Sequence, residues 1–253
     1  MKVVILAGGY GTRLSEVTST IPKHMVELGH ISILLHIMGI YAKHGYKDFF
    51  VALGYGAGII KDYFTKLSRM KSDYIVNLKS GLMTVHKEPD MDWNVTLVDT
   101  DLDTVAGGRI KRLKDYISDD DFLLTYGDGT ADVEIAATIE LHNSHNKLVT
   151  MTAAQPAARF SELDIEDNVV GSFEEKTQLH QGWINGGFFV CCPEVINYIE
   201  GGHEMFEREP PQKIIKGNEI AAYKHEGFRQ CMVSKRDHEN LNDLWDSGLA
   251  PWV

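Results

Sequence analysis

The sequence contains few cysteines and no long apolar run. Among its 253 residues only Cys191, Cys192 and Cys231 carry a thiol. Two of these are adjacent and the total is odd, so a disulfide framework is excluded, and no C-x-x-C metal-binding pair is present. We therefore expect reduced thiols and a cytoplasmic protein. No stretch approaches the roughly eighteen apolar residues of a membrane span. The apolar run at residues 3–6 is too short for a signal peptide.

The sequence also lacks an excess of basic residues. Its 25 lysines and arginines stand against 36 aspartates and glutamates, which gives a net charge of −11. This balance argues against a general binder of nucleic acids or anionic membranes, whose surfaces are usually basic. It leaves room for a nucleotide ligand, because a local group of cations and backbone amides can hold phosphates on an acidic protein.

No internal repeat, low-complexity tract or proline-rich linker divides the chain, so we expect a single domain over residues 1–253. Short apolar strands alternate with helical patterns, which favours an α/β fold. We expect a Rossmann-like, mixed but mostly parallel twisted sheet with helices on both faces, plus a small β-rich C-terminal portion. Strands are predicted at 2–6, 48–53, 94–99, 122–126, 149–154, 169–174 and 184–191. Helices are predicted at 33–44, 57–67, 109–116, 133–145 and 237–247, the last with Asp237 as its N-cap.

The first strand ends in a glycine-rich turn, Ala7–Leu14. Glycine allows backbone amides to approach a ligand closely, and successive exposed N–H groups form an anion site. Arg13 adds a planar cation that suits phosphate oxygens. Leu14 stands where a dinucleotide fingerprint needs its third glycine, and the Gly-Lys-Ser/Thr of a Walker A loop is absent. The turn therefore predicts a polyphosphate site of another class. The alternative is a strand followed by a glycine turn without a ligand.

Two further segments carry residues suited to phosphate chemistry. Lys23 follows Pro22, whose fixed φ presents the lysine on a defined stretch of chain. Asp128 stands between two glycines at the end of the predicted strand 122–126, where a carboxylate with open space suits Mg²⁺. In open α/β sheets, ligands lie beyond the carboxyl ends of the strands, as both this position and the glycine turn do. The alternatives are a solvated lysine and a Gly-Asp-Gly hairpin turn.

Leu6–Leu14 followed by Pro22-Lys23 resembles the signature of nucleotide-sugar pyrophosphorylases, which are nucleotidyltransferases acting on sugar 1-phosphates. Blocks at 93–100, 107–112, 125–129 and 184–190, and the closing Ala250-Pro251-Trp252, are similar to the glucose-1-phosphate cytidylyltransferases of that family. The resemblance implies transfer of CMP from CTP to a sugar 1-phosphate, with α-D-glucose 1-phosphate as the favoured acceptor. The products would be a CDP-sugar and pyrophosphate, and the cofactor Mg²⁺. The resemblance also implies a role in surface polysaccharide biosynthesis and a homo-oligomer. The nucleotide-binding part is expected over about residues 1–130 and the sugar-phosphate part over about 131–253.

The resemblance also assigns roles to individual residues. It implies that Arg13, Lys23 and Asp128 are catalytic and that Asp128 holds the metal. Nucleotide contacts are implied for Leu6, Ala7, Gly8, Gly9, Tyr10, Gly11, Thr12, Arg13, Lys23, Thr104, Gly108 and Arg109. Sugar-phosphate contacts are implied for Glu175, Lys176, Asn185 and Gly186. The alternatives are a solvated basic helix face that includes Arg109 and a solvated pair at Glu175-Lys176, where Thr177 replaces the proline of relatives.

The chain departs from the family pattern at three further positions. Val233 stands where relatives carry an aspartate that is a second metal ligand, His24 replaces a proline, and Gly56 replaces a lysine. Valine cannot coordinate a metal, which leaves three accounts: catalysis with Asp128 alone, another phosphorylated substrate, or a weakly active paralogue that binds nucleotide. Because the glycine turn, Lys23 and Asp128 are all retained, we favour an active enzyme.

Other candidate metal sites lack a complete ligand pattern. Asp99-x-Asp101-x-Asp103 begins like an EF-hand loop, but the glycine at position six and the glutamate at position twelve are missing. His142 and His145 lie three apart on a predicted helix with no third ligand at a zinc spacing. We interpret Asp119-Asp120-Asp121 as a solvated turn, and no motif marks Cys231 as a nucleophile.

Overall fold

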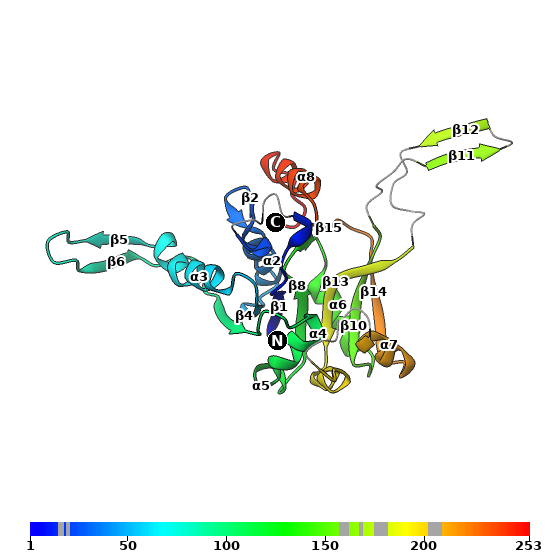
Figure 1. The fold of residues 1–253 in the computed structure, drawn as a ribbon, viewed down its shortest axis with the longest axis horizontal. Coiled ribbons are helices and arrows are strands. Elements are labelled where there is room, and N and C mark those ends of the chain that lie inside the picture. The colour runs from blue at the N-terminus through cyan, green and yellow to red at the C-terminus, as the bar shows by residue number, and fades with distance from the viewer. Residues whose placement is uncertain (15–17, 19–20, 157–161, 167–168, 175–181, 202–208) are drawn as a thin grey trace.

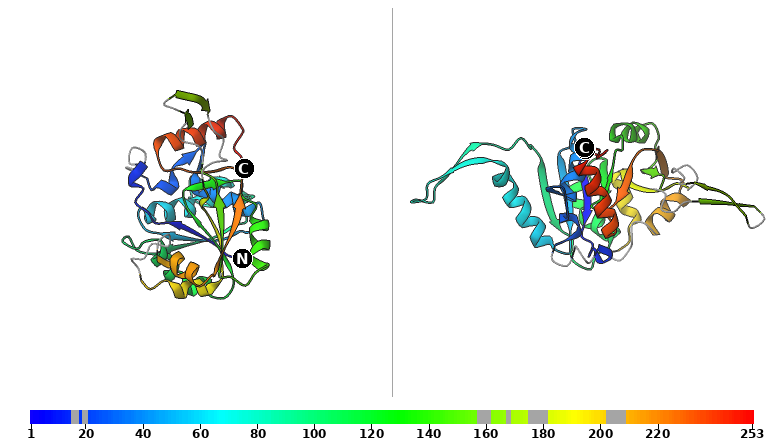
Figure 2. Two further views of the ribbon diagram at one scale, coloured as in Figure 1. Left: turned by 90° about the vertical axis from the view of Figure 1, so that its right-hand side faces the viewer. Right: turned by 90° about the horizontal axis from the view of Figure 1, so that it is seen from above.

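The structure, a computed structural model, describes the chain except residues 15–17, 19–20, 157–161, 167–168, 175–181 and 202–208 (Figure 1). Its central sheet is built from β1 (Val3–Ala7), β4 (Asp48–Leu53), β7 (Asn94–Asp99), β8 (Phe122–Tyr126), β10 (Val149–Ala154), β13 (Ile184–Cys191) and β14 (Ile220–His225). The strand order is β14-β10-β13-β8-β1-β4-β7. Within this sheet β13 runs antiparallel to both of its neighbours, and the other strands run parallel. The predicted mostly parallel sheet is confirmed, and Figure 2 shows its twist.

Helices cover both faces of the sheet, as predicted. Alternate residues of β1 point to opposite faces, Val3 and Ile5 into one buried cluster and Val4 and Leu6 into the other. A strand that is buried on both sides has this continuous apolar sequence. The first cluster is covered by α2 (Ile33–Ala42), α3 (Ala57–Lys71), α6 (Ile135–Asn143) and α8 (Lys235–Asp246). The second is covered by α4 (Ala106–Arg112), α5 (Lys114–Ile117), α7 (Glu209–Lys216) and the 3-10 helix η4 (Pro193–Tyr198).

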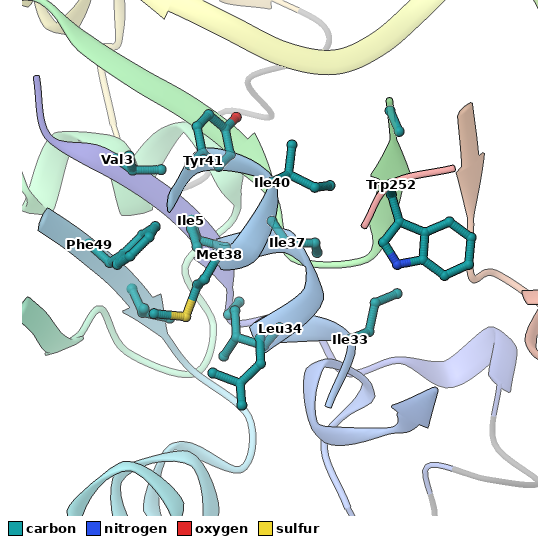
Figure 3. Close-up of a cluster of buried hydrophobic side chains, with 14 of the residues drawn as sticks. Val3, Ile5, Ile33, Leu34, Ile37, Met38, Ile40, Tyr41, Phe49 and Trp252 are labelled. Atoms are coloured by element: carbon teal, nitrogen blue, oxygen red, sulfur yellow. The ribbon is translucent and has the colours of Figure 1, made fainter. Parts of the chain in front are cut away.

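Helix α2 is buried on nearly every side and forms the centre of the first cluster (Figure 3). Ser32 caps it by accepting a hydrogen bond from Leu35 N, 3.4 Å away. The C-terminal Trp252 is 1% exposed, and its Nε1 donates to His36 Nδ1 at 3.1 Å. A helix that is apolar all round has to be enclosed, and the C-terminal segment completes that enclosure.

Most predicted elements lie where the apolar pattern placed them, but the helix boundaries differ from the prediction by up to four residues, as in α3, which ends at Lys71 instead of residue 67. Two of the differences have a clear local cause. The helix expected at 109–116 is two short helices, because Leu113 leaves the helical conformation with ψ near 2°. Helix α8 begins at Lys235 and its N-cap is Ser234, not Asp237. Asp237 is instead the third helical residue of a capping box, and its carboxylate accepts from Ser234 N at 2.8 Å.

Short ribbons complete the fold. They are β2 (Glu27–Leu28) with β3 (Ile31–Ser32), β9 (Gly129–Ala131) with β15 (Arg229–Cys231), β5 (Asp73–Val76) with β6 (Met83–Lys87), and β11 (Glu162–Glu166) with β12 (Val169–Glu174). The β5–β6 and β11–β12 hairpins project from opposite sides of the body (Figure 1). Ile75 and Leu78 on the first hairpin are 63% and 94% exposed. The expected homo-oligomer stays a prediction. No helix in the described part of the chain is long and apolar enough to cross a bilayer.

Candidate active site

A cavity of about 500 Å³ opens at the carboxyl ends of the parallel strands. Its volume is in the range of small-molecule sites, and its position is where open α/β sheets bind ligands. The glycine turn after β1 forms one wall, the segment after β7 a second, and the residues after β8 a third. The lining residues are Leu6, Gly8, Gly9, Tyr10, Gly11, Thr12, Lys23, His24, Leu102, Asp103, Thr104, Val105, Ala106, Arg109, Tyr126, Gly127, Asp128 and Val233.

The glycine turn has the open backbone that an anion site requires. Gly11 adopts φ +67°, a left-handed conformation that favours glycine, and its carbonyl accepts from Leu14 N at 3.0 Å. A Cβ on Gly9 would meet nothing within 4 Å, so this part of the turn has free space beside it. Tyr10 is 46% exposed and its hydroxyl donates to Asp103 Oδ1 at 3.2 Å. The short 3-10 helix η1 (Thr12–Leu14) follows, and the side chain of Arg13 lies outside the description.

Arg109 ties the glycine turn to the segment after β7. It is 4% exposed. Its Nη2 donates to Gly8 O at 3.0 Å and to Leu102 O at 3.3 Å, and its Nη1 donates to Asp101 O at 2.9 Å. Nη1 also donates to Leu53 O and to Thr100 Oγ1. The guanidinium therefore holds two walls of the cavity together, and its expected contact with the nucleotide stays a prediction.

The close approach of Arg109 explains why position 8 is a glycine, which phosphate binding alone does not explain. A Cβ on Gly8 would lie 2.1 Å from Arg109 Cζ, which no side chain can tolerate without moving the guanidinium. Gly8 is thus required by packing, whereas Gly11 is required by its backbone conformation.

The structure brings Lys23 and Asp128 together from positions 105 residues apart in the chain. Lys23 begins the 3-10 helix η2 (Lys23–Met25), directly after Pro22 with φ −64°. Its Nζ lies 2.6 Å from Asp128 Oδ2, and the two side chains are 12% and 27% exposed. The carbonyl of Asp128 accepts from Met232 N at 2.8 Å, which fixes the carboxylate-bearing residue at the end of β8. The ion pair faces the cavity, next to the glycine turn.

His24 is a cavity residue to which the sequence assigned no role. It packs under the chain at Gly127, where a Cβ would lie 2.5 Å from His24 Cδ2. Burial lowers the pKa of His24 to about 4, so the imidazole is neutral at pH 7. Its Nδ1 has no hydrogen-bond partner among the described residues. The replacement of proline by histidine next to Lys23 was the signal that pointed to this residue.

Asn185 and Gly186 lie at the start of β13, at the same edge of the sheet as the cavity but not in its lining. Asn185 Oδ1 accepts from Gly187 N at 2.8 Å, and Gly186 O accepts from Arg229 Nε at 3.2 Å. A Cβ on Gly187 would contact the ring of Tyr126, which does line the cavity. The pair therefore neighbours the cavity through Tyr126. Ala7 and Gly108 also lie outside the lining, and Glu175 and Lys176 fall outside the described residues.

Val233 lies in the cavity wall. Its position matters for metal binding, because relatives carry a metal-binding aspartate there. The nearby carboxylate of Asp237 accepts from Val233 N at 3.1 Å and from Ser234 Oγ at 2.8 Å, so it serves the cap of α8. The carboxylates in the lining are those of Asp103 and Asp128. Mg²⁺ is commonly held by one or two carboxylates together with phosphate oxygens. Asp128 thus fits a Mg²⁺ site that a bound polyphosphate would complete.

This chain is similar to known proteins in both sequence and fold. A glucose-1-phosphate cytidylyltransferase of Salmonella typhi is 47% identical over 253 residues, which cover 100% of this chain and 98% of the relative. A mannose-1-phosphate guanyltransferase of Saccharomyces cerevisiae is 28% identical over a region that covers 99% of this chain and 66% of that relative. The UTP-bound UGPase of Acinetobacter baumannii has a TM-score of 0.70 at 14% identity, covering 96% of this chain and 92% of that one, which supports the fold alone. The model of the nucleotidyl transferase family matches residues 2–248. This chain belongs to the nucleotidyl transferase family.

Proposed function

We propose that this enzyme transfers CMP from CTP to a sugar 1-phosphate, with α-D-glucose 1-phosphate as the preferred acceptor. The products are a CDP-sugar and pyrophosphate. The observation that carries the proposal is the Lys23–Asp128 pair, 2.6 Å apart in the cavity lining next to the glycine turn. The full-length identity of 47% to a glucose-1-phosphate cytidylyltransferase supports the choice of base and sugar.

In the proposed reaction an oxygen of the sugar phosphate attacks the α-phosphorus of CTP. One P–O bond forms, the bond between the α-phosphorus and the bridging oxygen breaks, and pyrophosphate leaves with the electron pair. No covalent enzyme intermediate is required, so the protein contributes positioning and charge neutralisation. The amides of Gly8–Gly11 and the cation of Arg13 hold the β- and γ-phosphates, and Lys176 positions the acceptor phosphate.

Lys23 has two partners in this scheme. In the free protein its ammonium neutralises Asp128 at 2.6 Å. When a triphosphate occupies the turn, the ammonium moves to the α-phosphate and offsets the charge that develops there. Mg²⁺ held by Asp128 would supply further neutralisation of the phosphate oxygens. The ion pair therefore keeps both side chains in the cavity until the substrate replaces it.

The lining of the cavity also suggests which part of the chain binds the nucleotide and which binds the sugar phosphate. The segment Leu102–Ala106 forms the wall across from the glycine turn and offers backbone groups to a flat base, with Thr104 buried at 6% exposure. Most lining residues precede residue 130, which supports the assignment of the nucleotide to about residues 1–130. The start of β13, next to Tyr126, supports assigning the sugar phosphate to about residues 131–253.

A second candidate function is a nucleotide-binding protein without turnover. Val233 favours it, because an apolar side chain in the cavity wall removes one carboxylate from the expected metal site. Retention of the Lys23–Asp128 pair favours the enzyme.

Pyrophosphate release distinguishes the two functions. The purified chain is incubated with Mg²⁺, each of the four ribonucleoside triphosphates, and the 1-phosphates of glucose, galactose and mannose. The enzyme releases pyrophosphate fastest with CTP and glucose 1-phosphate. CTP binding in calorimetry without pyrophosphate release for any sugar would establish the binding protein instead. The Lys23→Ala variant tests the role of the ion pair in this assay. Its matched control is Lys47→Ala, because Lys47 also forms an ion pair, with Asp92, but at an exposed position.

A further inference from the structure

Three potential metal ligands meet at the edge of the sheet opposite the cavity. Asp121 precedes β8, His142 lies in the last turn of α6, and Cys192 follows β13. Asp121 Oδ2 lies 3.6 Å from His142 Nε2, and Cys192 Sγ lies 3.4 Å from the same nitrogen. The three ligand atoms all lie within 4.8 Å of one another. A carboxylate, an imidazole and a thiol from three distant segments thus converge on one point.

The separations match those of ligands around a tetrahedral ion. With metal–nitrogen and metal–oxygen distances near 2.0 Å and a metal–sulfur distance near 2.3 Å, neighbouring ligand atoms are about 3.3–3.7 Å apart. The two measured separations at His142 Nε2 are within this range. Asp121 and Cys192 both approach Nε2. A catalytic triad is different, because there the acid and the nucleophile bind opposite nitrogens of the ring.

The orientation of the imidazole is fixed by a partner outside the cluster. His142 Nδ1 lies 2.9 Å from Thr150 Oγ1, and the ring is 3% exposed. Metal-binding histidines commonly use their second ring nitrogen in this way, which fixes the tautomer and the direction of the first. His145, three residues further along, lies 3.0 Å from the same hydroxyl and is not part of the cluster.

We propose that Asp121, His142 and Cys192 form a zinc site. Zinc is bound by thiolate, imidazole and carboxylate in tetrahedral geometry, whereas Mg²⁺ and Ca²⁺ select oxygen ligands. Water fills the fourth position. Asp121 and Cys192 are both partly exposed, so an ion has a path to the cluster.

The charges around Cys192 support a cation at this place. Burial is the main reason that the pKa of the Cys192 thiol is raised to about 12, and the carboxylates of Asp121, Glu194 and Glu219 raise it further. A divalent cation at this point would offset the negative field of these carboxylates.

The zinc site is separated from the cavity by the length of the five-residue strand β8, roughly 16 Å, so it takes no part in the proposed nucleotidyl transfer. It links the beginning of β8, the end of α6 and the end of β13. An ion that binds the folded chain and not the unfolded one stabilises the fold in proportion to the logarithm of its free concentration. The zinc proposal is independent of the proposed nucleotidyl transfer.

Cobalt titration of the full-length chain tests the proposal. The protein is stripped with EDTA, and Co²⁺ is added as a spectroscopic substitute for Zn²⁺ while thiolate-to-cobalt absorption is followed. We expect one equivalent of Co²⁺ with a thiolate band that Zn²⁺ displaces. Cys192→Ser removes the band, and Asp121→Asn weakens binding by about 100-fold or more, since even outer partners of metal ligands contribute roughly 10- to 100-fold.

Matched controls locate the ligands. Cys231→Ser keeps the band, although Cys231 is the other partly exposed thiol, and Asp120→Asn binds Co²⁺ like the wild type. The absence of a thiolate band in the wild type, or its persistence in Cys192→Ser, would overturn the proposal. If Cys192→Ser does not fold, as judged by circular dichroism, Asp121→Asn decides: unchanged Co²⁺ affinity in that variant also overturns it.

Discussion

Replacing Arg109 with methionine is expected to destabilise the fold and weaken nucleotide binding together. Methionine keeps the apolar stem but removes the guanidinium. The guanidinium of Arg109 donates to five acceptors. Two of these keep another donor in the variant, since Leu53 O also accepts from Thr100 N and Gly8 O also accepts from Tyr55 N. The carbonyls of Asp101 and Leu102 lose the bonds from Arg109.

The magnitude follows from these losses. An acceptor left without its partner costs about 1–3 kcal/mol. Asp101 and Leu102 belong to an exposed stretch, so water replaces part of each bond, and we take values from the lower half of that range. The free energy of unfolding should therefore fall by about 2–4 kcal/mol for the two acceptors together. The Michaelis constant for CTP should rise, because the glycine turn and the segment after β7 are no longer held together.

Urea unfolding followed by circular dichroism measures the stability, and pyrophosphate release gives the Michaelis constant. Arg112→Met is the matched control. Arg112 is on the same helix, but its ion pair with Asp101, at 3.2 Å, is half exposed. Such pairs contribute about 1 kcal/mol or less. If Arg109→Met is as stable as Arg112→Met while activity is lost, Arg109 acts as a ligand contact and not as the connection described above.

Three further predictions concern the cavity. Asp128→Asn and Lys23→Ala should each reduce the turnover number by at least about 100-fold, because each removes charge neutralisation from the transition state. The circular dichroism spectra should be unchanged. Near-wild-type turnover in either variant would refute the assignment. Val233→Asp should lower the Mg²⁺ concentration for half-maximal activity by about 10-fold, because one more carboxylate at the metal contributes at least ~1.4 kcal/mol of binding free energy. A Mg²⁺ titration of pyrophosphate release measures this concentration. An unchanged midpoint would contradict the prediction. As the pH falls from 6.5 toward 4, the unfolded chain takes up a proton that buried His24 does not, so the wild type should lose about 3 kcal/mol of stability. Urea unfolding of His24→Gln should lack this part of the pH dependence, and equal slopes for the two proteins would contradict it.

Most of the sheet could be predicted because burial leaves a pattern in the sequence. Strands β4, β7, β8, β10, β12 and β13 begin and end at the predicted residues. The β5–β6 hairpin could not be found in this way, since every residue of both strands is exposed and no face is selected by a core. Helix α8 was misplaced by two residues because Ser234 and Asp237 both suit a cap, and only the structure shows which of them stands outside the helix.

The backbone of the candidate site was easier to predict than its side-chain contacts. The glycine turn and Asp128 follow apolar strands, so the rule that ligands bind at the carboxyl ends of strands locates both. The enclosure of Arg109 depends on carbonyls that precede it by up to 101 residues. No local pattern encodes such a contact. The burial of His24 under Gly127 has the same origin.

The cluster at the opposite edge of the sheet was missed for a similar reason. His142 and Cys192 are 50 residues apart. The antiparallel β13 brings its end to the beginning of β8, and this places Cys192 beside Asp121. Local spacing directed attention to His142 and His145, which share the hydroxyl of Thr150 and not a ligand point.

The central claim is that the glycine turn binds the triphosphate while Asp128 holds the divalent ion. Crystals grown with CTP and Mn²⁺, examined by anomalous scattering, test it most directly. The account predicts a manganese peak about 2.1 Å from a carboxylate oxygen of Asp128, shared with phosphate oxygens whose β- and γ-groups contact the amides of Gly8–Gly11. Nucleotide bound elsewhere with the turn empty, or manganese away from Asp128, would contradict the account.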